Sequence, residues 1–244
     1  MLPLNKIACM DNMEYLKLLP DNCVDLVVTD PPYNVSQRKN MKFNGRFMTK
    51  NFGSWDFGFD PRPVLEELKR VLKPNGQIYL FCATKQIQEY MQILLDKWFF
   101  RNLLVWYKTN PPPRLSKTNF VFSTEYIIYA INEIGKVTDS TFNFKKHSEM
   151  HNVFITTSLR GKERIKDENN HILHPTQKPL SILKKLIEIS SNPGDIVLDV
   201  FMGTGSTAVA AKELGRNFLG CEIDKKYVNC AENRIISFFK AKCS

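Results

Sequence analysis

Short apolar runs alternate with amphipathic segments along most of this chain, and that alternation constrains its fold more than any other feature. Seven runs have the length of strands: 7–10, 24–28, 77–83, 102–108, 125–131, 196–201 and 218–223. Helical spacing of apolar residues marks 12–19, 61–72, 84–96, 180–190, 206–214 and a last segment from 225. Strands that alternate with helices form parallel βαβ units. The sequence therefore predicts an α/β fold with a doubly wound, mostly parallel, seven-stranded sheet.

Length and composition indicate a single domain, 1–244, with no membrane-spanning part. A chain of 244 residues can bury one sizeable core. The six cysteines show no paired spacing, so neither a zinc site nor a disulfide framework is expected. No signal-peptide pattern opens the chain, and no apolar run approaches membrane-spanning length. These features predict a soluble, cytoplasmic protein with no membrane partner.

Two segments interrupt the alternation, and the first of them, 34–60, is a basic loop without helical or strand periodicity. Its five basic residues precede its first acidic residue and are interleaved with aromatic residues; they are Arg38, Lys39, Lys42, Arg46 and Lys50. The whole chain carries a formal net charge of +9. Basic and aromatic side chains together suit phosphate contacts and base stacking. We therefore expect this loop to bind nucleic acid, with a solvated basic loop as the alternative.

The second interruption is the polar segment 132–173, in which one short apolar stretch, 153–155, is a candidate strand. Segments of this length without periodicity inside a compact domain usually have a task of their own. The segment is therefore interpreted as an insertion with a separate role, and a partly disordered surface excursion is the alternative.

The run at 24–28 leads directly into Thr29-Asp30-Pro31-Pro32-Tyr33-Asn34. Two consecutive prolines fix φ twice and remove two N–H donors, while their carbonyls can still accept. The carboxylate of Asp30 precedes them and the ring of Tyr33 follows. This combination predicts a rigid acceptor cluster beside a stacking surface, suited to a planar group with an amino substituent. An ordinary Pro-Pro turn is the alternative.

A second ligand site is indicated by Gly203-Thr204-Gly205, which joins the run at 196–201 to the segment 206–214. Glycines let the backbone approach a ligand closely, and Glu222 near the end of the next run could accept both ribose hydroxyls. The same pattern matches a dinucleotide fingerprint, so a nicotinamide-dependent oxidoreductase is an alternative. Asp199 within the strand, and the cluster at Asp30 that such an enzyme would not use, favour S-adenosylmethionine.

The order of these motifs resembles that of the permuted, beta-class DNA amino-methyltransferases. That family has Asp-Pro-Pro-Tyr first and Phe-x-Gly-x-Gly later, as in Asp30–Tyr33 and Phe201–Gly205 here. His174-Pro175-Thr176-Gln177-Lys178-Pro179 is similar to a further family motif. Gly53-Ser54-Trp55-Asp56 and Asn110-Pro111-Pro112-Pro113-Arg114 resemble the small adenine enzymes of MboII-like restriction-modification systems. The resemblance implies a circularly permuted, Rossmann-like methyltransferase fold, with 132–173 as a small target-recognition insertion.

The resemblance also implies site residues, with S-adenosylmethionine as the cofactor and no metal. The catalytic residues would be Asp30, Pro31, Pro32 and Tyr33. The cofactor would be bound by Asp11, Asp30, Thr176, Gln177, Lys178, Phe201, Gly203, Gly205, Ser206, Glu222 and Ile223. Asp11 has a local alternative as a helix N-cap. Val200 departs from the usual proline of the family, without an expected effect on binding.

The implied reaction moves a methyl group to the 6-amino group of adenine in double-stranded DNA. The base must be extruded, at a cost of a few kcal/mol. Tyr33 would stack on it, while Asp30 and the Pro31 carbonyl would accept the amino hydrogens. Sequence recognition is expected from 34–60, 110–117 with Arg114, and 132–173.

One hypothesis about assembly and two alternatives for function accompany this interpretation. A homodimer that shares the DNA contacts is a hypothesis. Methylation of the cytosine 4-amino group needs the same geometry. A non-catalytic DNA-binding module is a third alternative to the adenine enzyme, although Asp30, Tyr33 and Glu222 are intact.

Overall fold

The structure is a computed structural model that describes residues 2–34, 41–43, 46–48, 58–113, 117–132, 136, 139–159, 164–166, 172–173 and 176–243. Its α-helices are α1 (Asn12–Leu18), α2 (Pro61–Val71), α3 (Ile87–Lys97), α4 (Leu180–Ser190), α5 (Ser206–Glu213) and α6 (Lys225–Cys243). Its strands are β1 (Lys6–Cys9), β2 (Val24–Thr29), β3 (Met41–Phe43), β4 (Arg46–Met48), β5 (Leu72–Cys82), β6 (Phe99–Lys108), β7 (Thr124–Ile131), β8 (Val153–Thr156), β9 (Ile196–Asp199) and β10 (Asn217–Glu222). Two short 3-10 helices lie at Thr84–Gln86 and His147–Glu149.

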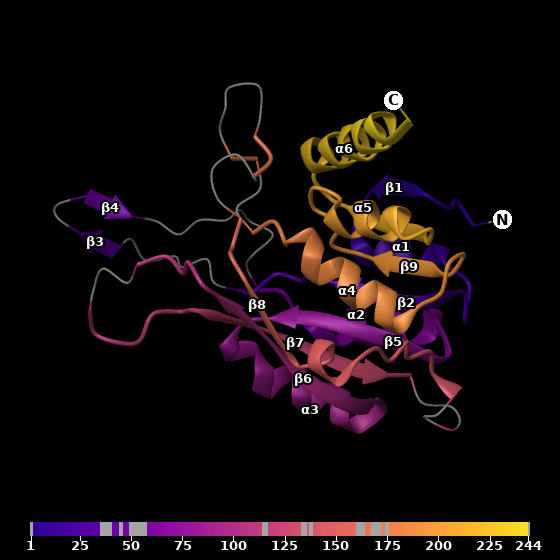
Figure 1. Cartoon of the computed structure of the whole chain (residues 1–244), viewed down its shortest axis with the longest axis horizontal. Coiled ribbons are helices and arrows are strands. Elements are labelled where there is room, and N and C mark those ends of the chain that lie inside the picture. Colours follow the sequence, from indigo (N-terminus) through magenta and orange to yellow (C-terminus); the bar gives the residue numbers. More distant parts are fainter. Residues whose placement is uncertain are drawn as a thin grey trace.

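The main sheet in the described part of the chain has the strand order β1-β10-β9-β2-β5-β7-β6-β8 (Figure 1). Neighbouring strands are parallel except at β7, which is antiparallel to both β5 and β6. The direction changes there as in a hairpin, because the described residues of the connection between β6 and β7 form no helix. The predicted doubly wound, mostly parallel sheet is confirmed. The strand beyond the expected seven is β8, which segment 132–173 adds to the edge beside β6.

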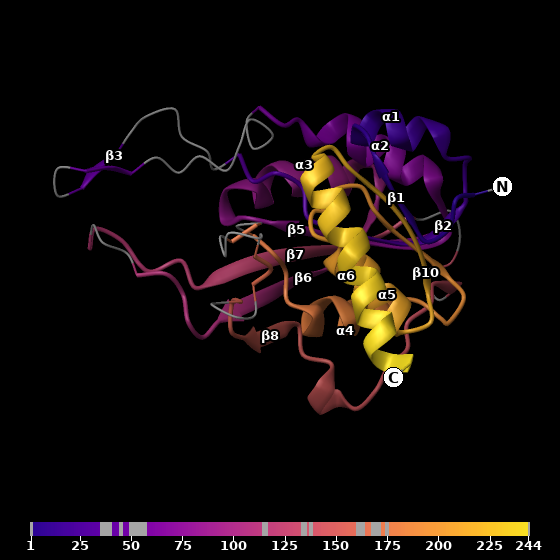
Figure 2. The ribbon, with the colours of Figure 1, turned by 90° about the horizontal axis from the view of Figure 1, so that it is seen from above.

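Strands in the middle of the sheet are apolar on both faces because helices cover both faces. Along β2, Leu26 and Val28 belong to one hydrophobic core and Val27 to the other. Helices α1, α2 and α3 lie on one side of the sheet and α4 and α5 on the other (Figure 2), and α6 packs into the same hydrophobic core as α4 and α5. No helix in the described ranges is long and apolar enough to cross a membrane.

The basic loop 34–60 contains more structure than its sequence predicts. Strands β3 and β4 pair antiparallel within it, although no strand periodicity is visible there. The side chain of Asn34 closes the base of the loop, since its amide donates to the carbonyl of Phe59 at 3.0 Å and accepts from the Phe59 N–H at 3.1 Å. The loop therefore leaves the end of β2 and returns to the same place.

Candidate active site

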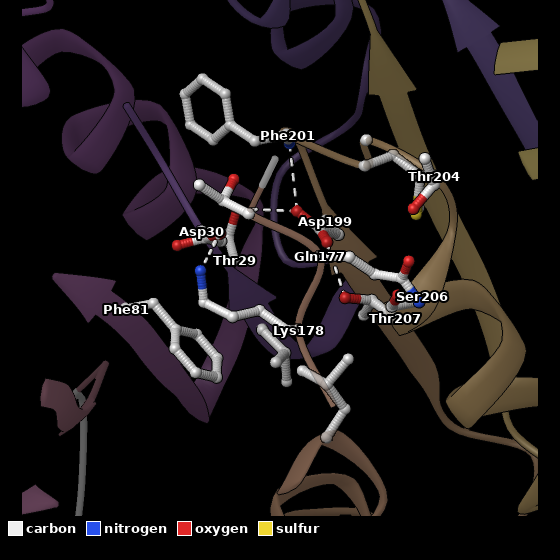
Figure 3. A pocket seen from close by; sticks show the side chains of 15 residues that line it. Thr29, Asp30, Phe81, Gln177, Lys178, Asp199, Phe201, Thr204, Ser206 and Thr207 are labelled. Atoms are coloured by element: carbon white, nitrogen blue, oxygen red, sulfur yellow. Dashed lines mark hydrogen bonds and ion pairs between the residues drawn. The ribbon is translucent and has the colours of Figure 1, made fainter. Parts of the chain in front are cut away.

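Strands β2 and β9 lie side by side in the middle of the sheet. The next main-sheet strand after β2 is β5, on one side of this pair, and the next strand after β9 is β10, on the other side. Doubly wound sheets bind ligands at such a point, beyond the carboxyl ends of the strands. A pocket lies there, lined from β2, β5, β9, α5 and the segment before α4 (Figure 3). It brings Asp30 and Gly203 together, although 173 positions separate them in the numbering. The two motifs predicted from sequence thus share one site.

The glycine turn needs glycine for two reasons. Gly203 and Gly205 have φ of 52° and 78°, in the left-handed region that residues with a Cβ rarely adopt. A Cβ at Gly205 would also come within 2.8 Å of the Cβ of Ala231 on α6. From α6, Arg234 donates to the carbonyl of Thr204 at 3.1 Å and to Oγ of Ser206 at 2.8 Å. The turn is therefore fixed in place by α6 at the start of α5.

Glu222, at the end of β10, supports this turn directly. Its Oε2 accepts from the N–H of Gly203 at 2.8 Å, and its Oε1 accepts from the N–H of Asp224 at 3.0 Å. Burial raises the pKa of Glu222, and these backbone hydrogen bonds oppose that shift. The next residue, Ile223, is 61% exposed. A carboxylate and an exposed apolar side chain therefore adjoin the turn.

Asp199 ties the two central strands to α5. Its Oδ1 accepts from Oγ1 of Thr29 at 2.8 Å and from the N–H of Phe201 at 3.0 Å, and its Oδ2 accepts from Oγ1 of Thr207 at 2.7 Å (Figure 3). Asp199 is 3% exposed, and burial raises the pKa of its carboxyl group to about 6, although these three donors lower it. Asp199 therefore holds the ends of β2 and β9 and the start of α5 together at the wall of the pocket.

Asp30 forms a buried ion pair with Lys178, whose ammonium group contacts Oδ2 of the carboxylate (Figure 3). Burial raises the pKa of Asp30, and the positive charge of Lys178 opposes that shift. The other oxygen, Oδ1, is buried and has no hydrogen-bond partner among the described residues. An acceptor atom therefore remains at the pocket for a donor on a ligand.

The Pro-Pro turn after Asp30 is held by two residues that the sequence did not single out. Nε2 of Gln86 donates to the carbonyl of Pro32 at 2.9 Å. The hydroxyl of Tyr33 donates to Oε2 of Glu125, at the start of β7, at 3.2 Å. The sequence pattern indicates only the first residue of a strand at Glu125 and a helical residue at Gln86. Position after a strand end was the one available signal for Gln86.

The structure places the other predicted cofactor residues in two groups. Thr176, Gln177, Lys178, Phe201, Gly203 and Ser206 line the pocket with Asp30. The second group is Asp11, Glu222 and Ile223. These residues lie where β1 and β10 end side by side, because the two strands pair in parallel and Cys9 lies opposite Glu222. Asp11 also caps α1, because its Oδ1 accepts from the N–H groups of Met13 and Glu14 at 2.8 and 3.3 Å. The N-cap alternative is confirmed, and cofactor contact by Asp11 stays a prediction.

The predicted nucleic-acid residues belong to the segments 34–60 and 110–117. Arg38, Lys39, Lys50 and Arg114 lie outside the described residues. Lys42 and Arg46 fall in β3 and β4, and the side chains of both lie outside the described part of the structure.

A doubly wound sheet with a glycine turn and an acidic residue on the next strand defines a Rossmann-like nucleotide-binding protein, here with a second acceptor site in the same pocket. The DNA methylase family, of N6 and N4 methyltransferases, matches residues 24–233, so the chain belongs to that family. The resemblance seen in the sequence is confirmed, and family membership argues against a nicotinamide oxidoreductase.

Individual relatives agree with this family. The chain is 38% identical to the type II methyltransferase M.HinfI of Haemophilus influenzae over 248 residues, which cover 95% of this chain and 68% of that protein. It is 31% identical to the type II methyltransferase M2.DpnII of Streptococcus pneumoniae, over 92% of this chain and 87% of that protein.

Solved structures show the same architecture. The M1.HpyAVI–SAM complex superposes with a TM-score of 0.70 at 28% identity, covering 94% of this chain and 98% of that one. The cytosine-N4-specific PvuII DNA methyltransferase has a TM-score of 0.69, over 95% of this chain and 88% of that one. At 15% identity, the second likeness shows the fold alone.

Asp199→Asn should change how stability depends on pH. The folded-state pKa of about 6 lies above the ordinary value of 3.8, so the folded protein binds this proton more tightly than the unfolded chain. The resulting stabilisation is present below the ordinary pKa and is lost as pH rises through the folded pKa, a change of roughly 3 kcal/mol. Urea unfolding should show wild type losing that much stability relative to Asp199→Asn between about pH 4 and pH 7. The exposed Asp96→Asn is the control, and a constant difference for Asp199→Asn would contradict the expectation.

Proposed function

We propose that this chain transfers a methyl group from S-adenosylmethionine to the 6-amino group of an adenine extruded from double-stranded DNA. The observation that carries the proposal is the buried Oδ1 of Asp30, which has no partner among the described residues and lies at the pocket shared with the glycine turn. Membership of the DNA methylase family supports it. So do the type II methyltransferase relatives and the structure of M1.HpyAVI in complex with SAM.

The residues at the glycine turn fit S-adenosylmethionine. The positive-φ glycines leave the main chain open to close approach, and the carboxylate of Glu222 suits ribose hydroxyls. The exposed Ile223 offers an apolar surface for the adenine of the cofactor, and Thr176 and Gln177 offer polar groups for its amino-acid end. When bound, this cofactor supplies a methyl group on an electrophilic sulfonium. The chemistry requires no metal.

Asp30 and its neighbours would activate the amino group of the target base. The lone pair of that nitrogen is delocalised into the ring, which makes it a poor nucleophile. If Asp30 Oδ1 and the Pro31 carbonyl accept the two hydrogens, the lone pair turns out of the ring plane. The carboxylate also stabilises the positive charge that develops on nitrogen, and it can take the proton that the product loses. The ring of Tyr33 would stack on the extruded base.

DNA would lie at the end of the molecule from which two segments project. The connection between β6 and β7 and the β3–β4 pair reach outward on the same side of the molecule (Figures 1 and 2). Residues 109–123 include no acidic residue, and Phe120 is 91% exposed. Basic side chains of these two segments would contact phosphates: Arg38, Lys39, Lys42, Arg46, Lys50 and Arg114. Segment 132–173 would add target recognition, and the DNA substrate would place the enzyme at the nucleoid.

Asp30→Ala should abolish methyl transfer, because it removes the acceptor that orients the amino group and stabilises its charge. Tritium transfer from labelled cofactor to DNA measures the rate, and Glu232→Gln on α6 is a surface control that should keep wild-type activity. A rate above about one tenth of wild type would contradict the role of Asp30. Analysis of methylated nucleosides in the same product distinguishes adenine from cytosine, the second candidate, which needs the same geometry.

Glu222→Gln should weaken cofactor binding about tenfold or more, since the amide loses one acceptor shared between the glycine turn and the ribose. Isothermal titration calorimetry with S-adenosylmethionine measures the dissociation constant. Glu232→Gln, an acidic side chain exposed on α6, is the matched control. Unchanged affinity for Glu222→Gln would remove the ribose assignment.

We expect a homodimer that shares the DNA contacts, because segments 34–60 and 132–173 are short for a complete recognition surface. Light scattering should give about twice the 28.3 kDa of one chain for the protein alone, and the same protein mass plus that of the duplex for the complex with DNA. A strictly monomeric protein under both conditions would contradict it.

A further inference from the structure

The active site contains a buried network of charges in which the methyl-transfer scheme above gives Lys178, Glu125 and Lys108 no role. Lys178 is 6% exposed, contacts Oδ2 of Asp30, and lies 3.5 Å from Oε2 of Glu125. The same Oε2 accepts from the hydroxyl of Tyr33, and Oε1 of Glu125 pairs with the ammonium of Lys108. Two lysines, two carboxylates and a tyrosine hydroxyl are therefore joined in one network.

We propose that Lys178 and Glu125 are positioning residues for Asp30. Lys178 keeps Asp30 ionised and occupies one of its oxygens, so that the other faces the target amino group. Glu125 shares Lys178 with Asp30 and orients Tyr33. This inference rests on the proposed function, in which Asp30 accepts a hydrogen of the amino group.

The role of Lys178 follows from the different environments of the two Asp30 oxygens. A buried carboxylate with no cation nearby tends to take up a proton. A protonated Asp30 could place its hydrogen on the acceptor oxygen and would lose the charge that stabilises the transition state. The ammonium group of Lys178 prevents this, and it contacts Oδ2 while Oδ1 has no partner among the described residues. Lys178 therefore selects which oxygen is available.

The role of Glu125 follows from its position between Lys178 and Tyr33. Lys108, at the end of β6, holds one of its oxygens, and the side chains of both residues are mostly buried. The other oxygen receives the Tyr33 hydroxyl and lies within ion-pair distance of Lys178. The ammonium of Lys178 also lies 5.1 Å from the centre of the Tyr33 ring. Glu125 therefore orients the stacking ring and the cation together.

The other titratable groups that act on Asp30 are Cys82 at the end of β5, Tyr90 on α3, Asp199 at the end of β9, and Tyr33. Burial raises the pKa of both tyrosines, so their hydroxyls are neutral at ordinary pH, and the Tyr33 hydroxyl, like Lys178, lowers the pKa of Asp30. Burial raises the pKa of the Cys82 thiol to about 12, so this thiol is neutral at ordinary pH. Asp199 is occupied by its three donors. Among the described residues, Lys178 is the cation in direct contact with Asp30. Lys178 lowers the pKa of Asp30, and the charge of Glu125 raises it, so the two neighbours act in opposite directions.

The test is the titration of the Asp30 carboxyl in the full-length protein, without cofactor or DNA. Carbon-13 NMR of labelled aspartate follows the side-chain carboxyl against pH, and Asp30→Asn identifies its resonance. Lys178→Met should move the Asp30 midpoint to higher pH, whereas Glu125→Gln should move it to lower pH. Lys178→Arg, which keeps the charge, should restore the wild-type midpoint.

An unchanged midpoint in Lys178→Met, or shifts in the same direction for the two variants, would overturn the proposal. Lys184→Met is the matched control, because Lys184 pairs with Glu213 at 3.2 Å away from this network and should leave Asp30 unaffected. Circular dichroism checks folding. If Lys178→Met does not fold, Lys178→Gln replaces it, since glutamine keeps a donor without the charge, and it must also raise the midpoint.

Methyl transfer provides a second readout that separates this proposal from the proposed function. The acidic limb of kcat against pH should move in the same two directions as the NMR midpoints. At neutral pH kcat should fall roughly tenfold or more in Lys178→Met, with a smaller change in KM for DNA. No methyl transfer to DNA by the wild-type protein would reject the proposed function and leave the NMR result to decide the inference. An active wild type with unmoved midpoints would reject the positioning roles alone.

Discussion

The parallel pairing of β2 with β9 is the constraint on which the site depends. These strands are far apart in sequence, yet Leu26 lies beside Val197 and Val27 beside Leu198. The pairing leaves Asp30 and the glycine turn at the same edge of the sheet. The hydrogen bond from Thr29 to Asp199, which spans 170 positions of the chain, fixes the two strand ends relative to each other. Without this pairing the acceptor cluster and the turn would be two unrelated loops.

Most of the fold could be predicted because its helices and central strands have a clear apolar pattern. The central strands are apolar on both faces, and α2 and α4 show clear apolar stripes, so their positions follow from the spacing of residues alone. Strands β3 and β4 have three residues each and lie in polar sequence, where periodicity carries no information. Strand β8 has four residues; its apolar stretch 153–155 made it a candidate strand, and its place in the sheet is defined by its pairing with β6. That pairing is a long-range contact, which a local pattern does not contain.

The site residues likewise fall into those that local sequence predicts and those that only long-range contacts reveal. Asp30 with its two prolines and Gly203 with Gly205 were predicted because each group has a local backbone signature. Glu125 and Gln86 were missed because nothing near them in sequence marks them, and their roles arise only when β5 and β7 meet the loop after β2. The resemblance predicted Lys178 as a cofactor residue, and the structure gives it a carboxylate partner as well.

In the proposed reaction, one buried cation paired with Asp30 alone would keep Asp30 ionised but would also oppose methyl transfer. In the proposed reaction a positive charge develops on the target nitrogen, which is hydrogen-bonded to Asp30. A lysine paired with that carboxylate alone would repel this positive charge. Coulomb interactions are strong in a buried site, so the position of Lys178 matters. Glu125 supplies a second negative charge within ion-pair distance of the lysine, and Lys108 balances Glu125 in turn. The network can therefore keep Asp30 ionised before transfer while the sharing of Lys178 limits its repulsion of the nitrogen during transfer.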